Sequence, residues 1–387
     1  EMRMFRDFIR DPQKLPNPQL TGYHSGMLAG FPAVEGHFLA PIFMRGESPY
    51  ENEGGGFEFD GAGEPIVQRW ESVPFVVMLP NTPGPHPVMV WQDGTGWSEW
   101  SHADREVVQE YVSAGFAVFG FLPQFHGSRA TPGSDDQLST YNYFNPEAVR
   151  TTLRQQAIEV IYSLRLLKYS FAEVPELSSL DTTRMVYAGH SQGTLPGGML
   201  AAVETEFRAY LLSASASYLS ITILERSDVD IESLMRALLD IERPLDRFHP
   251  ALAVAQLGAD AVEPHNYARY WRGSPQRPSG ANVYVINGFT DDTTHPIGMS
   301  FLTIAGDLAP IAPAGWDVDP YDVWSREPES LPVQGNRSGF DGLPHTLATY
   351  LDPVTGHGTI HEVGFARTLG LNFLLDALDG VPELAAP

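Results

Sequence analysis

A serine between two glycines is the residue in this chain whose setting best fits covalent chemistry. The sequence Gly-His-Ser-Gln-Gly at 189–193 centres on Ser191, after an apolar stretch that predicts a strand at 184–188 and before a predicted helix at 192–205. A sharp strand-to-helix turn requires glycine on both sides, because larger side chains would collide across it. The helix dipole would also favour negative charge developing at Ser191. We therefore predict that Ser191 is a nucleophile; the alternative is a tight glycine turn around an ordinary serine.

A serine hydroxyl needs a neighbouring base, and the most favourably placed one is His357. It lies in a Gly-His-Gly loop directly after the predicted strand at 346–351. His361 is the rival, but it falls at the start of the predicted final helix. His190, inside the glycine turn, is expected to be a packing or hydrogen-bonding residue. We predict that His357 takes the Ser191 proton.

The base needs a third group that fixes its tautomer, and two carboxylates compete for this role. Asp291 and Asp292 follow the predicted strand at 282–286. Asp291 is favoured because it stands three residues after Gly288, the usual spacing for an acid after a strand. Asp292 remains the alternative, and it could equally be a turn or helix-capping residue.

Acyl transfer also needs two backbone N–H groups that bind the oxyanion. One comes from the residue after the nucleophile, Gln192, and we assign the other to Thr95 in the glycine-rich turn at 92–96, although such a turn could be merely structural. Asp93 precedes this turn, and a carboxylate close to an oxyanion is unfavourable, so Asp93 should point away or be paired. Further residues expected to line the substrate site are Gly94, Trp97, His126 and Phe289.

These residues require a particular scaffold, and the order of predicted elements supplies it. From about residue 65, apolar strands at 67–70, 73–79, 87–91, 116–122, 184–188, 210–213, 282–286 and 346–351 alternate with helices at 104–113, 145–167, 192–205 and 362–378. Such alternation predicts a mostly parallel sheet with helices on both faces, with sites at the carboxyl ends of the strands.

Two segments depart from this alternation. Residues 1–65 are expected to be irregular, an N-terminal arm or added hairpin layer with strand-like pieces at 36–43 and 57–59. Residues 218–280 are helical and lie between two strands, so we predict a cap over the site. The expected organisation is an arm at 1–65, a first core part at 66–217, the cap at 218–280 and a second core part at 281–387.

Composition excludes several classes of function. The formal net charge of −24 repels phosphate backbones, so nucleic acid is not an expected partner. The absence of cysteine excludes disulfides and a Cys nucleophile. No apolar run reaches the ~20 residues needed to span a membrane. No cofactor is expected; a Ca²⁺ site is conceivable at Asp317, Asp319 and Asp322, with Asp135 and Asp136, but surface carboxylates are favoured.

The chain resembles the α/β hydrolases over residues 70–380, and bacterial lipase/esterase-like proteins in particular. The resemblance rests on short motifs in order: Val-Pro-Phe at 73–75, Trp-Gln-Asp-Gly at 91–94, His-Gly-Ser-Arg at 126–129, Asn-Pro at 145–146 and the turn at 189–193, followed by His-Pro at 249–250, Asn-Tyr at 266–267, Gly288 to Asp291, and Gly-His at 356–357. It implies hydrolysis of a small or polymeric carboxylic ester, with Ser191, Asp291 and His357 as the triad. Asp93 departs from the family, in which His often precedes that glycine.

The resemblance also implies a secreted or periplasmic protein, although no signal peptide is visible. Two other functions remain open. A peptidase or acyltransferase would use the same triad, because specificity depends on the pockets for the acyl and leaving groups. A binding protein could have kept the fold and lost catalysis, but the intact Ser, Asp and His argue against it.

Overall fold

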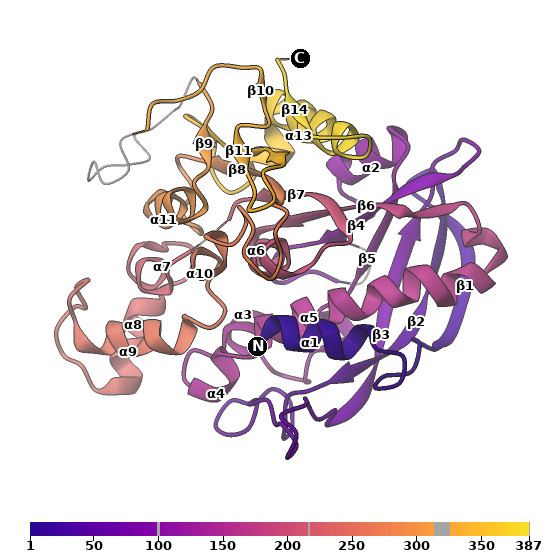
Figure 1. Cartoon of the computed structure of the whole chain (residues 1–387). Helices are drawn as coiled ribbons and strands as arrows, with labels where there is room; N and C mark the ends of the chain where they lie inside the picture. The colour runs from indigo at the N-terminus through magenta and orange to yellow at the C-terminus, as the bar shows by residue number, and fades with distance from the viewer. Residues whose placement is uncertain (99–100, 216, 313–325, 387) are drawn as a thin grey trace. The chain divides into compact units, whose positions relative to one another are not determined.

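A computed structural model describes residues 1–98, 101–215, 217–312 and 326–386 (Figure 1). The chain divides into two compact units, Glu1–Arg208 and Ala209–Pro387. No helix among the described residues is long and apolar enough to cross a bilayer.

The strands of the first unit lie in the order β1-β2-β3-β5-β4-β6. The first four are antiparallel neighbours, whereas β4 pairs parallel with both β5 and β6. Almost every residue of β4 and β5 is buried, as expected for strands covered on both faces. The bounds are β1 Leu20–Leu28, β2 Phe31–Ile42, β3 Arg69–Met78, β4 His86–Gln92, β5 Ala117–Phe121 and β6 Leu180–His190.

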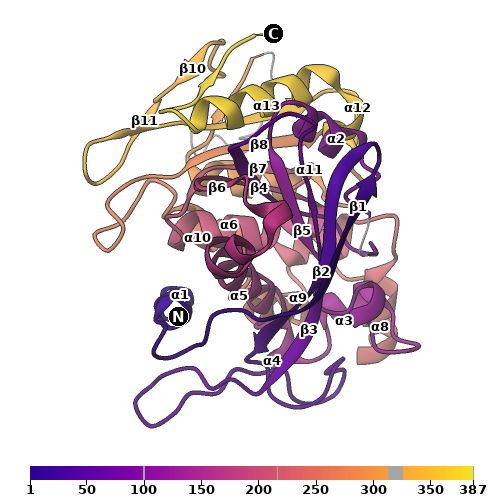
Figure 2. The same cartoon turned by 90° about the vertical axis from the view of Figure 1, so that its right-hand side faces the viewer.

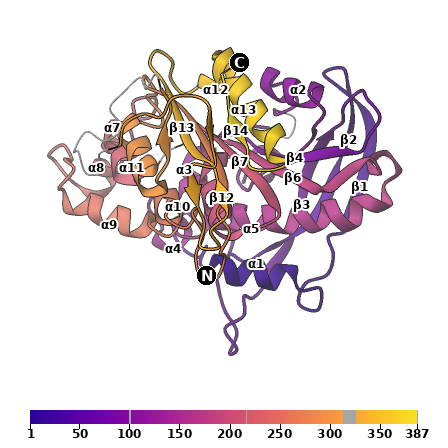
Figure 3. The same cartoon turned by 45° about the horizontal axis from the view of Figure 1, so that its top comes forward.

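Helices cover both faces of these strands. On one face α5 contacts α1, α6 and β2, and α2 lies on the other face (Figures 2 and 3). All residues of α5 are buried. The bounds are α1 Met2–Arg10, α2 Glu106–Ser113, α3 Asp136–Tyr141, α4 Pro146–Val149, α5 Thr152–Arg165 and α6 Thr194–Val203.

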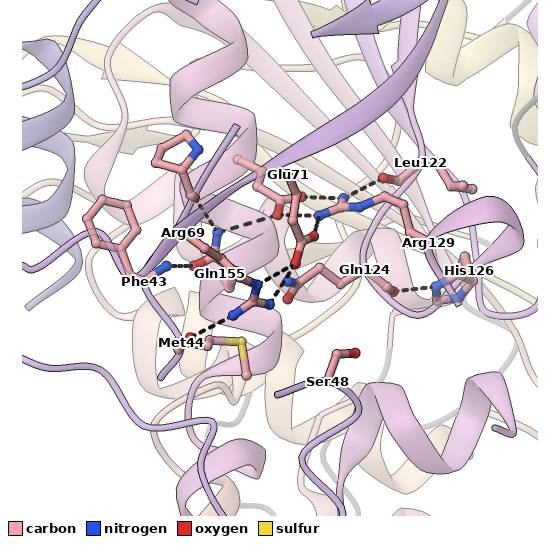
Figure 4. A network of polar contacts seen from close by, with 12 residues as sticks. Phe43, Met44, Ser48, Arg69, Glu71, Leu122, Gln124, His126, Arg129 and Gln155 are labelled. Atoms are coloured by element: carbon pink, nitrogen blue, oxygen red, sulfur yellow. Dashed lines mark hydrogen bonds and ion pairs between the residues drawn. The ribbon is translucent and has the colours of Figure 1, made fainter. Parts of the chain in front are cut away.

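A buried ionic network ties α5 to the strands (Figure 4). The Arg129 guanidinium binds both carboxylate oxygens of Glu159 on α5, at 2.8 and 2.9 Å, and donates to Glu71 on β3 at 2.9 Å. Glu71 also accepts from Arg69. On the same helix, Gln155 accepts from the Phe43 N–H and donates to the carbonyl of Pro41, each at 3.0 Å. Because both carboxylates are paired, the burial of these charges is compensated.

The second unit contains a parallel set of strands in the order β7-β8-β13-β9. Helix α13 packs against β8 and the short β14, and α11 packs against β8 and α10 (Figure 1). The bounds are β7 Phe207–Ser213, β8 Asn282–Gly288, α11 Pro296–Gly306, β9 Ala309–Pro310, β10 Val333–Gln334, β11 Arg337–Ser338, β12 Pro344–His345, β13 Leu347–Asp352, α12 Thr359–Glu362, α13 Gly364–Ala377 and β14 Glu383–Leu384.

The segment 218–280 between β7 and β8 is helical. It holds α7 Leu219–Glu225, α8 Ile231–Leu239, α9 Pro250–Ala259 and α10 Pro264–Ala268. Glu263, which precedes α10, ties that helix to the start of α7, because the buried carboxylate accepts from the backbone N–H groups of Tyr218 and Leu219. That this segment caps the site stays a prediction.

Some sequence-based expectations are wrong. Residues 1–65 are not irregular: α1 forms there, and β1 and β2 make an antiparallel hairpin, which agrees with the added hairpin layer that the sequence left open. Helix α1 buries Met2, Phe5 and Ile9 on one face, a pattern that the nearby prolines outweighed in the sequence. The polar, glycine-containing β1 resembles a loop because it is largely exposed at the end of the strand order. The strands expected at 67–70 and 73–79 are the single strand β3, and the helix expected at 145–167 is broken into α4 and α5.

Candidate active site

Ser191 lies in a strained turn at the end of β6. The strand ends at His190, a 3₁₀ turn covers Ser191–Gly193, and α6 begins at Thr194. The φ angle of Ser191 is +52°, in the left-handed region that residues other than glycine seldom adopt. Such a conformation costs about 1–3 kcal/mol, and it persists only where the surrounding structure enforces it.

The two flanking glycines enforce that turn by steric necessity. A Cβ at position 189 would lie 2.4 Å from the carbonyl oxygen of Gly193, and a Cβ at 193 would lie 2.2 Å from that of Gln92. Neither clash can be relieved by a side-chain rotation, because the opposing atoms belong to the backbone. The close approach also brings the end of β4 against the turn that carries Ser191.

The glycine-rich turn after β4 adjoins the serine. A Cβ at Gly94 would lie 3.5 Å from the Ser191 hydroxyl oxygen. The Thr95 hydroxyl donates to Oε1 of Gln192 at 2.8 Å. The two residues predicted to supply oxyanion N–H groups are therefore linked directly by their side chains. Their role in binding an oxyanion stays a prediction.

Asp93 is paired. Its Oδ1 lies 3.7 Å from Nε of Arg105, and the Arg105 guanidinium lies 3.5 Å from the centre of the Trp97 ring. Burial raises the pKa of Asp93 to about 6, although Arg105 acts in the opposite direction. Both the pairing and the raised pKa limit the negative charge that this carboxyl places near the Gly94–Thr95 turn.

His126 and Trp97 lie near the same turn. With Asp93 and Gly94 they line a small cavity of about 20 Å³. His126 is completely buried, with Nδ1 2.8 Å from the carbonyl oxygen of Gln124, and burial lowers its pKa. The fourth expected substrate residue, Phe289, follows β8 in the second unit and is 40% exposed.

The acid and the histidine meet within the second unit. The Asp291 carboxylate lies 2.9 and 3.1 Å from Nδ1 of His357, in geometry that suits an Nδ1–H donor. Asp291 also accepts from the N–H groups of Thr293 and Thr294, at 2.9 and 2.7 Å, and from the Thr294 hydroxyl. Its side chain is fully buried, whereas that of His357 keeps 27% of its surface exposed.

The rival residues have other positions. Asp292 is exposed, and Ser227 lies 3.5 Å from its carboxylate. His361 falls within α12, and His190 is buried at the end of β6. The structure thus pairs His357 with Asp291, and the catalytic role of that pair stays a prediction.

No group of three or more His, Asp or Glu in the described part of the chain could hold a metal ion. Asp317, Asp319 and Asp322 lie outside the described residues. Asp135 caps α3 by accepting from the N–H groups of Gln137 and Leu138.

Known structures resemble this chain at low identity. Acetyl xylan esterase 1 from Thermoanaerobacterium sp. JW/SL YS485 aligns with a TM-score of 0.55 and 15% identity, covering 97% of this chain and 92% of that one. The chain has the α/β-hydrolase fold. An acetyl xylan esterase from Paenibacillus sp. R4 has the same fold, with a TM-score of 0.51 and 13% identity over 92% of this chain and 89% of that one. No family model and no curated protein sequence matches the chain.

Sequence reasoning missed the residues that support this fold's candidate site. Arg105 could have been sought as the partner that a buried Asp93 requires. Thr294 could have been noticed as a hydroxyl three residues after Asp291. Gln156 on α5, whose side chain bonds to those of Gln92 and Gln192, gave no sequence signal beyond being a polar residue among the apolar positions of a helix.

Proposed function

We propose that this protein is a serine hydrolase that cleaves carboxylic esters through an acyl-enzyme. In the first step, Nε2 of His357 removes the proton of the Ser191 hydroxyl while its oxygen attacks the ester carbonyl carbon. The carbonyl oxygen becomes an oxyanion, bound by the N–H groups of Gln192 and Thr95. His357 then passes its proton to the departing alcohol, which leaves Ser191 acylated.

In the second step, His357 removes a proton from water, and the resulting hydroxide attacks the acyl carbon. Collapse of the second oxyanion releases the carboxylic acid, and the proton on His357 returns to Ser191. Asp291 holds the imidazole with Nδ1 protonated, which leaves Nε2 free to act as base, and stabilises its positive charge in both steps. The proposal requires Ser191 and His357 to meet, as the order of the residues along this fold implies.

The observation that carries the proposal is the backbone of Ser191. A non-glycine residue at φ +52°, between two glycines that backbone contacts exclude from substitution, is a costly arrangement. An ordinary turn gains nothing from this strain, since glycine at 191 would remove it. A nucleophile gains a hydroxyl presented beside the Gly94–Thr95 turn. The buried Asp291–His357 pair is the second support.

The test combines turnover with covalent labelling. The protein should hydrolyse p-nitrophenyl acetate and be labelled by a fluorophosphonate, and Ser191→Ala should lose both, with a fall in turnover of at least ~10³-fold. Circular dichroism and the melting temperature should show that the variant is folded. Undiminished hydrolysis by Ser191→Ala would overturn the assignment, and a wild-type chain that is neither labelled nor active would point to a binding protein.

A panel of esters addresses the substrate. We propose short acyl groups on a carbohydrate alcohol as the first class to test, because the two structural neighbours above are named acetyl xylan esterases. The panel should therefore grade p-nitrophenyl esters by acyl length and include a peracetylated sugar. We also propose that segment 218–280 sets the acyl preference. Replacing apolar residues of this segment should then change the preferred acyl chain length more than the melting temperature.

A further inference from the structure

Three glutamine side chains form a continuous hydrogen-bonded chain beside Ser191. The amide of Gln192 donates to Oε1 of Gln156 at 3.1 Å, and the amide of Gln156 donates to Oε1 of Gln92 at 3.0 Å. Gln92 in turn donates to the carbonyl of Trp91 at 3.0 Å. At the other end, Oε1 of Gln192 accepts from the Thr95 hydroxyl.

Each amide in this chain has a fixed orientation. Gln156 uses its oxygen as acceptor toward Gln192 and its nitrogen as donor toward Gln92, so rotating the amide by half a turn would break both bonds. All three glutamines are buried, with 1–4% of their surface exposed. Buried amides without partners are costly, so the chain has one favoured arrangement.

The chain joins three elements that meet at the nucleophile. Gln92 is the last residue of β4, Gln156 lies on α5 and Gln192 follows Ser191. The two members at one end of the chain, Thr95 and Gln192, are the residues that the proposed function uses as oxyanion donors. By accepting from the Gln192 amide nitrogen and donating to Gln92, Gln156 holds the Gln192 amide in the orientation that accepts from Thr95.

We infer that Gln156 is a positioning residue for the oxyanion hole, acting through the side chain of Gln192 on the Gly94–Thr95 turn. The inference rests on the proposed function. Without Gln156, the Gln192 amide nitrogen and Oε1 of Gln92 both lose a buried partner. The Gln192 amide then rotates toward another hydrogen-bond partner, and the Thr95 hydroxyl loses the acceptor that fixes the Gly94–Thr95 turn. Oxyanion donors act mainly on the transition state, so the loss should appear in kcat rather than in KM.

The chain offers a matched control one residue away. Gln155 is an equally buried amide on the same helix, but it bonds to Phe43 and Pro41 at the end of β2 and, at 3.4 Å, to Glu159 (Figure 4). Gln155→Leu therefore removes the same group from α5 without touching the glutamine chain. Both leucine variants should have a lower melting temperature than wild type, whereas only Gln156→Leu should affect catalysis.

The experiment measures p-nitrophenyl acetate kinetics for wild type, Gln156→Leu and Gln155→Leu. Gln156→Leu should lower kcat by about 10- to 100-fold with KM within about twofold, and Gln155→Leu should leave kcat within about twofold. An equal fall in kcat in both variants, or no fall in kcat in Gln156→Leu, would refute the inference. Hydrolysis that persists undiminished in Ser191→Ala would instead refute the proposed function, so the two failures are distinguishable.

Gln156→Glu supplies a second, nearly isosteric test, which also decides the matter if Gln156→Leu does not fold. An ionised carboxylate still accepts from Gln192 but repels Oε1 of Gln92, whereas a protonated carboxyl can accept and donate as the amide does. The ratio of variant to wild-type kcat should therefore rise as the pH falls. Taking the ratio cancels the protonation of His357, which both proteins share. A ratio that does not change with pH would contradict the positioning role.

Discussion

The candidate residues around Ser191, in the first unit, and those around His357, in the second, are held in place by different kinds of force. Around Ser191 the constraint is steric, because backbone atoms stand where a Cβ at 189 or 193 would lie. Around His357 the constraint is polar, because the orientation of the imidazole depends on a carboxylate that is itself fixed by three hydrogen bonds. Steric constraints do not respond to pH or ionic conditions, whereas hydrogen bonds to a charged group do. In the proposed reaction, His357 is therefore the group through which pH and ionic conditions should act.

The sharpest test of this contrast is at the acid. Asp291→Asn should keep the shape of the pair but favour the wrong imidazole tautomer, lowering kcat by about 10⁴-fold. Asp292→Asn is the matched control, since its carboxylate is exposed, and it should keep kcat within about twofold. Steady-state kinetics with p-nitrophenyl acetate measure both. Comparable losses in the two variants would remove the distinction between the neighbouring aspartates.

A substitution that breaks the steric constraint around Ser191 should instead lower the free energy of unfolding. Gly193→Ala forces a Cβ to 2.2 Å from the Gln92 carbonyl oxygen, so the strand end or the turn must move, at a cost of about 4 kcal/mol or more. Gly61→Ala places its Cβ where no atom lies within 4 Å and should change stability by less than about 0.5 kcal/mol. Urea unfolding monitored by tryptophan fluorescence compares them. A Gly193→Ala protein as stable as wild type would show that the turn is not sterically enforced.

Asp93 is a pH-sensitive group next to the Gly94–Thr95 turn, which adjoins Ser191. Its pKa, raised by burial from 3.8 to about 6, means that the folded state holds this proton more tightly than the unfolded chain. Stability from this group is therefore full below about pH 4 and falls as the pH rises to about 6. Relative to wild type, Asp93→Asn should gain up to about 3 kcal/mol of unfolding free energy between pH 4 and pH 7. Urea unfolding at both pH values tests this, and a constant difference would show that the carboxyl has an ordinary pKa.

The smallest expected effect concerns the backbone strain at Ser191. Ser191→Gly should abolish hydrolysis and raise the unfolding free energy by about 1 kcal/mol, because glycine adopts a φ of +52° without steric cost. Ser191→Ala loses the same hydroxyl but keeps the strain, so it serves as the reference. If Ser191→Gly is no more stable than Ser191→Ala, the left-handed conformation carries no cost here.

The sequence revealed residues with strong local signals and missed those whose role comes from packing. Ser191, Asp291 and His357 could be proposed because each follows an apolar strand in a glycine-containing loop, a pattern that is local in sequence. The Asp291–His357 contact joins positions far apart in the chain, yet the order of the strands made it predictable. The Gln92–Gln156–Gln192 chain and the identity of the residue that pairs with Asp93 could not be predicted, because nothing in the spacing of these residues indicates which distant polar groups become neighbours. Helix α1 was missed because charged residues interrupt its apolar ones and prolines follow it at positions 12, 16 and 18.

Helix α5 has a consequence for how this sequence can change. All 14 of its residues are buried, and nearby positions bond to different neighbours: Gln155 bonds to the end of β2, Gln156 to Gln92 and Gln192, and Glu159 to Arg129. A helix at a protein surface has a solvent face on which substitutions accumulate with little effect, and α5 has none. In a library of random single substitutions, its positions should be among the least tolerant in the chain, and changes there should become acceptable mainly in pairs with their contact partners.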